Sequence, residues 1–243
     1  MNIIKLNATD STNEFLKRLK RETHLDDFTV VTADFQTNGK GQMGSEWKSE
    51  ASKNLMVSIL KKFDNLNITL QFNISLAISL AVYKTINLYL PDKLSIKWPN
   101  DILSDGFKIA GILIENTITD SKISDSIIGI GINVNQVIFS SEIKKVSSLK
   151  LILNTDVDRD LLLRKLLINI ETELLKVTNK DFINLKVEYL NYLYKKGIPT
   201  MFEDSRNIKF LAIIKDVSES GQLLVELENK QIKLFNFKEI KFL

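Results

Sequence analysis

The segment Lys97-Trp98-Pro99-Asn100-Asp101 does most to decide the fold of this chain. Its first two residues end a strand predicted at residues 95–98, which is expected to pair with a strand at 108–115 around a turn at Ser104-Asp105-Gly106. Trp, Pro, Asn and Asp in succession are more than a simple connection between strands requires. We therefore treat the segment as a candidate functional site.

Lys108 opens the second of these strands, Lys108-Ile109-Ala110-Gly111-Ile112. Strand alternation would place Lys108 on the same face as Ala110 and Ile112. A lysine on a mostly apolar face either extends to water or holds an anion there, and both interpretations stay open.

A long loop is predicted upstream, at residues 36–53, where glycines and polar residues replace aliphatic ones. Gly39, Gly41 and Gly44 allow backbone to approach a ligand closely, and Lys40 adds positive charge. The loop matches neither the Walker P-loop nor the Rossmann fingerprint. Alone it favours an anion site no more than a flexible connector.

A third unusual segment is Gly129-Ile130-Gly131-Ile132-Asn133, in a strand predicted at residues 127–134. The two glycines interrupt an apolar run that ends in amides. One interpretation is a bulge beside a neighbouring backbone, and the other is a ligand packed on the glycines with Asn133 as a polar contact. Taken singly, the bulge is favoured.

The spacing of apolar residues in the rest of the chain predicts an α+β fold, in which helices flank a mixed sheet. The first helix should begin at a capping box formed by Ser11 and Glu14, because Ser-x-x-Glu precedes apolar residues at helical spacing. The other elements are strands at 28–35 and 54–60 and helices at about 11–21, 67–88, 158–178 and 181–195.

The residue pattern stops being helical at Gly197-Ile198-Pro199, because Gly ends a helix and Pro cannot continue it. From there the chain alternates as strands do, which predicts a small SH3-like β-barrel. We therefore expect two domains, residues 1–196 and 197–243.

Composition excludes several chemistries. The 243 residues include no cysteine and one histidine, His24, so disulfides, thiolate nucleophiles and His-rich zinc sites are excluded. The N-terminal segment lacks the pattern of a secretory signal, and no apolar run approaches membrane-spanning length. We therefore expect a cytoplasmic protein with no protein-held metal and no membrane partner.

Taken in order, these segments resemble the biotin protein ligase family in its short form without an N-terminal DNA-binding domain. The resemblance covers residues 9 to about 135 and is most specific from Lys97 to Gly111. The matching positions are Ser11-Thr12-Asn13, Gln36, the glycines of residues 39–44, Trp47, Lys97-Trp98-Pro99-Asn100-Asp101, Lys108, Gly111 and Gly129-x-Gly131-x-Asn133.

Two departures from the family pattern matter. The family's loop commonly reads G-R-G-R-x-G, whereas this chain has Lys40 and Gln42, so one guanidinium becomes an ammonium and the other a neutral amide. Family members that repress transcription carry a winged helix before the Ser-Thr-Asn motif, and the ten residues present there cannot hold one. We therefore expect no DNA binding.

The resemblance implies that ATP activates biotin as biotinyl-5'-adenylate, with Mg²⁺ on the polyphosphate. The biotinyl group would then pass to one lysine of the biotin carboxyl carrier domain of a carboxylase such as acetyl-CoA carboxylase. A monomer or weak homodimer is expected. A lipoate or octanoyl ligase, which shares the fold, and a biotin sensor that has lost turnover are the alternatives.

By the same resemblance, three groups of site residues are expected. The catalytic group is Lys108, Asp101 and Lys40. The biotin group is Ser11, Thr12, Asn13, Gln36, Gly39, Lys40, Gly41, Lys108, Gly111, Gly129 and Gly131. The ATP and adenylate group is Lys40, Gln42, Met43, Trp47, Asn100, Lys108 and Asn133.

Overall fold

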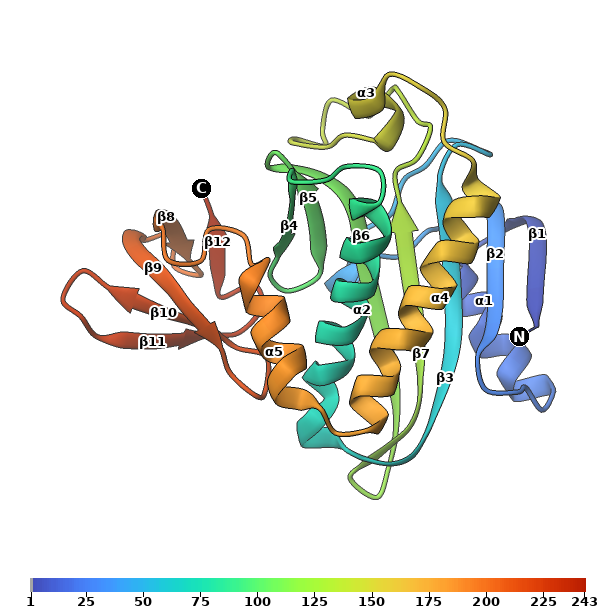
Figure 1. Cartoon of the computed structure of the whole chain (residues 1–243), viewed down its shortest axis with the longest axis horizontal. Coiled ribbons are helices and arrows are strands. Elements are labelled where there is room, and N and C mark those ends of the chain that lie inside the picture. The colour runs from blue at the N-terminus through green and yellow to red at the C-terminus, as the bar shows by residue number, and fades with distance from the viewer. Residues whose placement is uncertain (1) are drawn as a thin grey trace.

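A mixed seven-stranded sheet forms the larger part of the protein, as a computed structural model of residues 2–243 shows (Figure 1). Its strand order is β1-β2-β3-β7-β6-β5-β4, and only the β1 and β2 pair is parallel. The strands are β1 (Ile3–Thr9), β2 (Thr29–Gln36), β3 (Leu55–Asn67), β4 (Leu94–Lys97), β5 (Asp101–Ser104), β6 (Phe107–Thr119) and β7 (Lys122–Ile132).

Helices cover both faces of this sheet, since successive strand residues point to opposite sides. On one face, α2 (Gln71–Asn87), α4 (Arg159–Thr178) and α5 (Phe182–Asn191) pack over the main core (Figure 1). On the other face, α1 (Thr12–Glu22) packs Leu16 against Val31 and Leu60. No helix within residues 2–243 is both long and apolar enough to cross a bilayer.

A ring of alternating charges joins the three helices on the first face. Lys84 of α2 lies 2.6 Å from both Glu173 of α4 and Glu188 of α5. Lys176 lies 2.8 Å from the same two carboxylates. The Glu173 side chain is only 2% exposed, so the ring satisfies a charge that burial would otherwise penalise.

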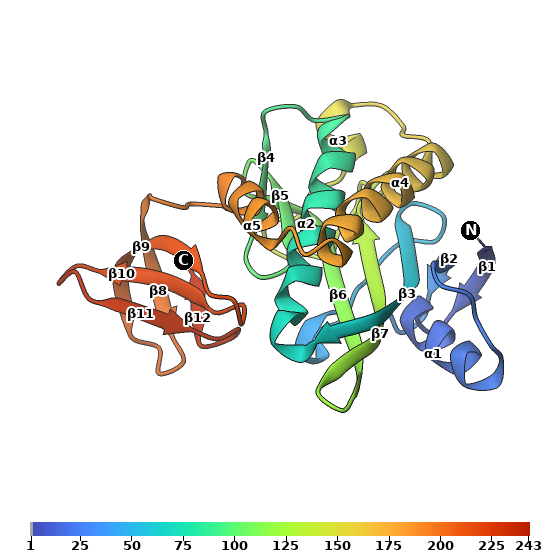
Figure 2. The same cartoon turned by 60° about the horizontal axis from the view of Figure 1, so that its bottom comes forward.

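The C-terminal segment forms a five-stranded antiparallel sheet beside the larger one (Figure 2). Its strands, in the order β11-β10-β9-β8-β12, are β8 (Pro199–Asp204), β9 (Lys209–Val217), β10 (Leu223–Leu227), β11 (Ile232–Phe235) and β12 (Ile240–Phe242). Stacked Phe202, Phe210 and Phe235 fill its interior. This matches the expected α+β fold with a small C-terminal β unit.

The C-terminal sheet is attached directly to the segment that decides the fold. The Trp98 indole donates to the Gly221 carbonyl at 2.9 Å, and its ring lies 6.2 Å from that of Phe237. Gly221 has φ +91, and a Cβ there would come within 2.5 Å of the Phe72 ring. A glycine is required at this junction because the conformation and the space both exclude a side chain.

The expected strand pair around residues 104–106 is wrong in one respect. That turn joins β5 to β6, and β4 pairs with β5 instead of β6. The four-residue β5 is too short to show a period in the sequence. Two more short elements, β1 and α3 (Leu149–Leu153), were also absent from the sequence-based expectation.

Candidate active site

Two glycines on adjacent strands make a flat floor for an aromatic ring. Gly131 of β7 pairs directly with Gly111 of β6. A Cβ on Gly131 would lie 2.4 Å from Trp47 Cε2, and one on Gly111 would lie 3.0 Å from Trp47 Cζ3. The indole therefore rests where side chains would stand, and within residues 2–243 its buried Nε1 has no hydrogen-bond partner.

Gly129 makes space for a different side chain. A Cβ at this position would lie 2.4 Å from Asn13 Oδ1, at the start of α1. β7 pairs with β6 without a register shift at either glycine, so the favoured interpretation of a bulge here is wrong. The glycines instead let Asn13 and Trp47 approach the sheet closely.

Lys108 lies on the opposite face from the one that alternation predicts. The register between β5 and β6 shifts so that Leu103 pairs with Lys108 while Ile102 pairs with Ala110, which leaves one extra residue in β6. The Lys108 Nζ consequently lies 3.2 Å from where a Gly111 Cβ would stand. It also lies 5.7 Å from the centre of the Trp47 ring.

Lys108 is paired with Asp101 at this face. Its Nζ is 2.6 Å from Asp101 Oδ1, and the two side chains are 34% and 21% exposed. The backbone of Lys108 is held by Lys145 and Ser147, whose segment pairs with it in parallel. This arrangement places a cation beside the indole and the glycine floor.

The motif at the start of α1 forms a buried hydrogen-bond network with Gln36 and Ser58. Thr12 donates to Gln36 Oε1 from its backbone N at 2.8 Å, and its hydroxyl lies 3.0 Å from the same oxygen. The Ser58 hydroxyl lies 2.7 Å from Thr12 Oγ1 and 2.5 Å from Asn13 Oδ1. Asn13 Nδ2 donates to Glu115 Oε2 at 2.7 Å.

The predicted capping box does not form. Ser11 occupies the N-cap position of α1, but its side chain makes no capping hydrogen bond. Glu14 accepts from Lys40 at 2.8 Å and from Lys17 at 2.9 Å, and these two cations lower the pKa of its carboxyl group. The Glu14 carboxylate is thus engaged by one lysine of its own helix and by the loop lysine Lys40, which it holds against α1.

A cavity of about 790 Å³ contains most of the predicted site residues. Of these residues, it is lined by Ser11, Thr12, Asn13, Gln36, Lys40, Gly41, Gln42, Met43, Trp47, Asn100, Asp101, Lys108, Gly111, Gly129 and Gly131. Gly39 and Asn133 are not among its lining residues. The Gly39 carbonyl instead accepts from the Trp47 backbone N at 2.8 Å.

The two predicted nucleotide-binding asparagines make structural hydrogen bonds. Asn100 Nδ2 donates to the Ile112 carbonyl at 2.8 Å, while the Ile112 amide donates back to the Asn100 carbonyl at 3.0 Å. Asn133 is buried, and its Nδ2 donates to the Ser147 carbonyl at 3.0 Å. Each amide thereby fixes the backbone around the cavity.

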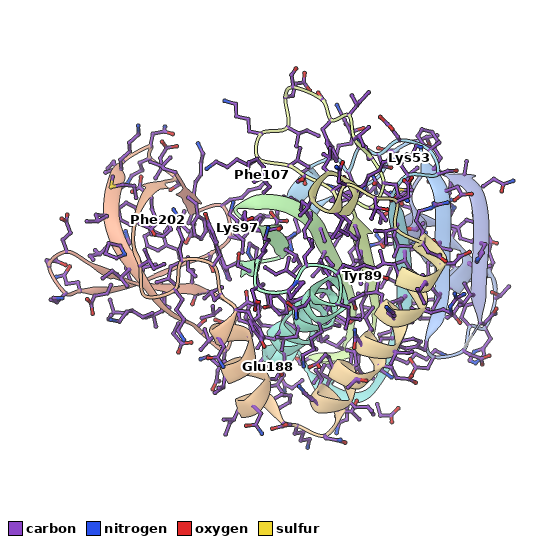
Figure 3. The ribbon with its side chains drawn as sticks, turned by 45° about the horizontal axis from the view of Figure 1, so that its top comes forward. Lys53, Tyr89, Lys97, Phe107, Glu188 and Phe202 are labelled. Carbon is purple, nitrogen blue, oxygen red and sulfur yellow. The ribbon has the colours of Figure 1, made fainter. Side chains whose placement is uncertain are left out.

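The far wall of the cavity comes from the C-terminal sheet. Lys97 lies between the two sheets, with its Nζ 5.1 Å from the Phe242 ring, and burial lowers its pKa (Figure 3). Lys238 donates to the Met43 carbonyl of the glycine loop at 3.1 Å. Lys241 also lines this wall. The cavity is therefore lined by cations from β4 and the C-terminal unit as well as by the neutral side chains of Thr12 and Gln36.

The sequence profile of the biotin/lipoate A/B protein ligase family matches residues 6–133, more than half of the chain. This chain belongs to that family. A biotin protein ligase from Aquifex aeolicus, solved in complex with biotin and ATP, has 31% sequence identity and a TM-score of 0.80. The superposition covers 100% of this chain and 98% of the Aquifex chain.

Curated relatives of the ligase family extend the comparison. The bifunctional ligase/repressor BirA of Bacillus spizizenii is 31% identical over 214 residues, which are 86% of this chain and 64% of BirA. The chain thus spans less than two thirds of that relative. The biotin--[acetyl-CoA-carboxylase] ligase of Mycobacterium tuberculosis is 26% identical over 228 residues, 92% of this chain and 83% of its own length.

Several residues in and around this candidate site were not identified from the sequence. Ser58 gives a usable signal, since it is a lone polar residue in the apolar run of β3. Glu115 follows the apolar run of residues 109–114 within β6 and gives a similar signal. Lys97 was quoted as part of the motif but was given no role, and Lys238 carries no local signal because only the tertiary fold brings it to the loop.

Proposed function

We propose that this chain is a biotin protein ligase: it joins biotin to ATP as biotinyl-5'-adenylate and transfers the biotinyl group to a lysine of a biotin carboxyl carrier domain. One observation carries the proposal. The cavity has neutral hydrogen-bonding groups at Thr12 and Gln36 and cations at Lys108 and Lys97. Biotin has a neutral ureido ring at one end and a carboxylate at the other.

In the first step, an oxygen of the biotin carboxylate attacks the α-phosphorus of ATP and the bond to pyrophosphate breaks. Both reactants are anions, so fixed cations are needed to bring them together. Lys108 would contact the carboxylate and the α-phosphate. Lys97 and Lys238 face the same space and would hold the phosphates that leave.

In the second step, the amine of the acceptor lysine attacks the adenylate carbonyl, and AMP leaves with the phosphate oxygen. The amine has to be neutral to attack, and Asp101 is our candidate to orient it or to accept its proton. Lys108 touches this carboxylate, so it would orient Asp101 and also contact the phosphate that leaves.

Magnesium would arrive with ATP as part of the substrate. Within residues 2–243 there is no cluster of three His, Cys, Asp or Glu side chains that could hold a metal ion. Mg²⁺ is commonly held by substrate phosphates with one or two carboxylates, and Asp101 is an acidic residue lining the cavity at the glycine floor. The ion would neutralise charge on the polyphosphate.

The loop at residues 39–49 would retain the adenylate by excluding water. Trp47 already covers the glycine floor, and Lys238 ties Met43 to the C-terminal sheet. Gln42 brings no charge to the cavity, so retention depends on Lys40 and on the lysines of the far wall. We propose that residues 1–196 and 197–243 act together in this step.

The test is pyrophosphate release from ATP-Mg²⁺ and biotin, with and without a carboxylase carrier domain. We expect biotin-dependent release, transfer of biotin to the carrier, and loss of both in Lys108→Ala. Lys230→Ala, at an exposed lysine of the C-terminal sheet, serves as the matched control. Biotin binding without pyrophosphate release would indicate a sensor, and activity with lipoate alone would indicate the related ligase class.

A further inference from the structure

The helix α4 is apolar on two opposite sides. One side carries the buried residues that pack on the main core. The other side carries Leu161, Ile168 and Leu175, which are 39%, 62% and 54% exposed. Residues seven apart return to the same side of a helix after about two turns, so these three side chains form one apolar stripe. The stripe lies in the helical layer that faces the viewer in Figure 1, and the described part of the chain leaves it open.

Two charged residues beside the stripe have no partner in the chain. Arg164 and Glu171 are exposed, and within residues 2–243 neither side chain makes an ion pair or a hydrogen bond. They lie about 10 Å apart along the helix axis, too far to pair with each other. The other charged residues of α4 all have contacts, which are Arg159 with Asp34, Asp160 with Lys5, Lys165 with the ring of Tyr89, and Glu173 with Lys176.

A two-fold axis beside Ile168 would bring the unpaired charges together. In such an antiparallel pair of α4 helices, Ile168 meets its own copy, and Leu161 meets Leu175 of the second copy. Arg164 and Glu171 lie on the same flank of the stripe, one turn before and one turn after Ile168. The rotation reverses the direction of the helix but keeps this flank. Arg164 of each copy therefore lies opposite Glu171 of the other copy.

The other flank of the stripe is compatible with the same pairing. Lys165 is turned over Tyr89, with its Nζ 5.0 Å from the centre of the ring. The Thr172 hydroxyl donates to the Ile168 carbonyl of its own helix at 2.9 Å. The rotation places Lys165 opposite Thr172 of the second copy, so like charges do not meet on this flank either.

We infer that the stripe is an interface for a second copy of this chain, in an antiparallel α4 pair that forms two ion pairs between Arg164 and Glu171. An interface centred on one helix is small, so we expect a weak dimer with a Kd on the order of 100 µM and a monomer well below that concentration. α4 covers the sheet face opposite α1, and the first residues of α1 line the cavity. Pairing therefore leaves both cavities open.

Sedimentation equilibrium of the whole chain, at concentrations on either side of this Kd, tests the inference. We expect a reversible dimer that weakens as salt is added, because the ion pairs are exposed. Arg164→Glu and Glu171→Arg each place like charges opposite one another twice. Each variant alone should therefore dimerise at least about tenfold more weakly than the native chain. Mixed in equal amounts, the two variants restore opposite charges at both positions and should associate about as tightly as the native chain.

Ile168→Asp provides a second test, since it brings two carboxylates together at the axis and should abolish association. Its matched control is Ile183→Asp, at an apolar residue of α5 that is 79% exposed and lies outside the stripe. This control should leave the dimer unchanged. Far-UV circular dichroism checks that each variant is folded.

Three results would overturn the inference. The first is a native chain that stays monomeric at every concentration, which would leave the stripe to a different protein. The second is a dimer that is indifferent to Arg164→Glu or Ile168→Asp, and the third is a mixture that associates no more tightly than its components. None of these measurements depends on turnover of biotin, so the proposed function is tested separately.

Discussion

The Nζ of Lys108 lies 2.6 Å from Oδ1 of Asp101, across the neighbouring strands β5 and β6. This contact couples the cation proposed for the first step to the carboxylate proposed for the second. Asp101→Asn leaves the Lys108 side chain in place, so adenylate formation should survive better than transfer. We expect transfer to the carrier lysine to slow about 100-fold, with a much smaller change in pyrophosphate release, in single-turnover quench experiments. Equal losses in both steps would contradict the assignment.

Gly131→Ala should disturb the Trp47 indole. The new methyl group would lie 2.4 Å from Cε2, so the ring has to leave the glycine floor. We expect the KM for biotin to rise about tenfold or more, comparable to the cost of overpacking a filled site. The check is a double-mutant cycle with Trp47→Ala. If the methyl group acts through the indole, Gly131→Ala should add little in that background.

Lys238→Ala should loosen the glycine loop. Its side chain joins the Met43 carbonyl to the C-terminal sheet, and removing it leaves that part of the loop without this tie. We expect faster tryptic cleavage after Lys40 and Lys48 and more free biotinyl-adenylate in solution. Biotinylation of bystander proteins would report the escaping adenylate. Lys230→Ala is the control, and identical behaviour of the two variants would argue against the tie.

Glu173→Gln should destabilise the packing of α2, α4 and α5. It removes the buried anion that faces Lys84 and Lys176, which leaves two cations with only Glu188 between them. Breaking one partner of a buried ion pair costs about 3 kcal/mol of unfolding free energy. Urea unfolding measures this change. The neighbouring Glu171 is exposed, and Glu171→Gln should change stability by less than about 0.5 kcal/mol.

Glu14→Gln should have an effect on stability that depends on pH. Lys40 and then Lys17 lower the pKa of Glu14 below its ordinary value of 4.5 in the folded protein. The ion pairs therefore contribute fully above pH 4.5 and lose their contribution as pH falls through the lower, folded-state pKa. At pH 7 we expect a loss of about 0.5 to 1 kcal/mol in Glu14→Gln, typical of partly exposed pairs.

The same pair of unfolding curves at low pH provides the internal check on Glu14. The native chain and Glu14→Gln should become equally stable once the carboxyl group is protonated in the folded state. A difference between the two that is the same at neutral and acidic pH would show that the substitution acts through packing instead of charge.

Much of the fold follows from local pattern. The helices at 67–88 and 158–178 and the strand at 127–134 were expected close to where α2, α4 and β7 lie, because each has a long, consistent apolar pattern. The expected boundary at residue 197 stays a prediction. What local pattern could not predict is the extra residue in β6, since alternation assumes an unbroken strand.

The candidate site likewise combines features that local sequence predicts with features that only tertiary packing decides. The motifs bring most of the expected residues to one cavity, but their contacts depend on tertiary packing. Glu14 matches the local sequence rule for a capping box. Its carboxylate instead accepts from Lys17 of α1 and from Lys40 of the loop. The purpose of Gly129 and Gly131 depends on Asn13 and Trp47, which are more than 80 positions away in the chain.

The hydrogen bond from Trp98 to Gly221 has a consequence for engineering the protein. The indole belongs to the signature segment, but its acceptor and its aromatic neighbour Phe237 come from the C-terminal sheet. A chimera that exchanges this sheet for one from a relative would have to import a compatible glycine and aromatic residue with it. Without them, the graft would leave an unpaired indole N–H in the wall of the cavity.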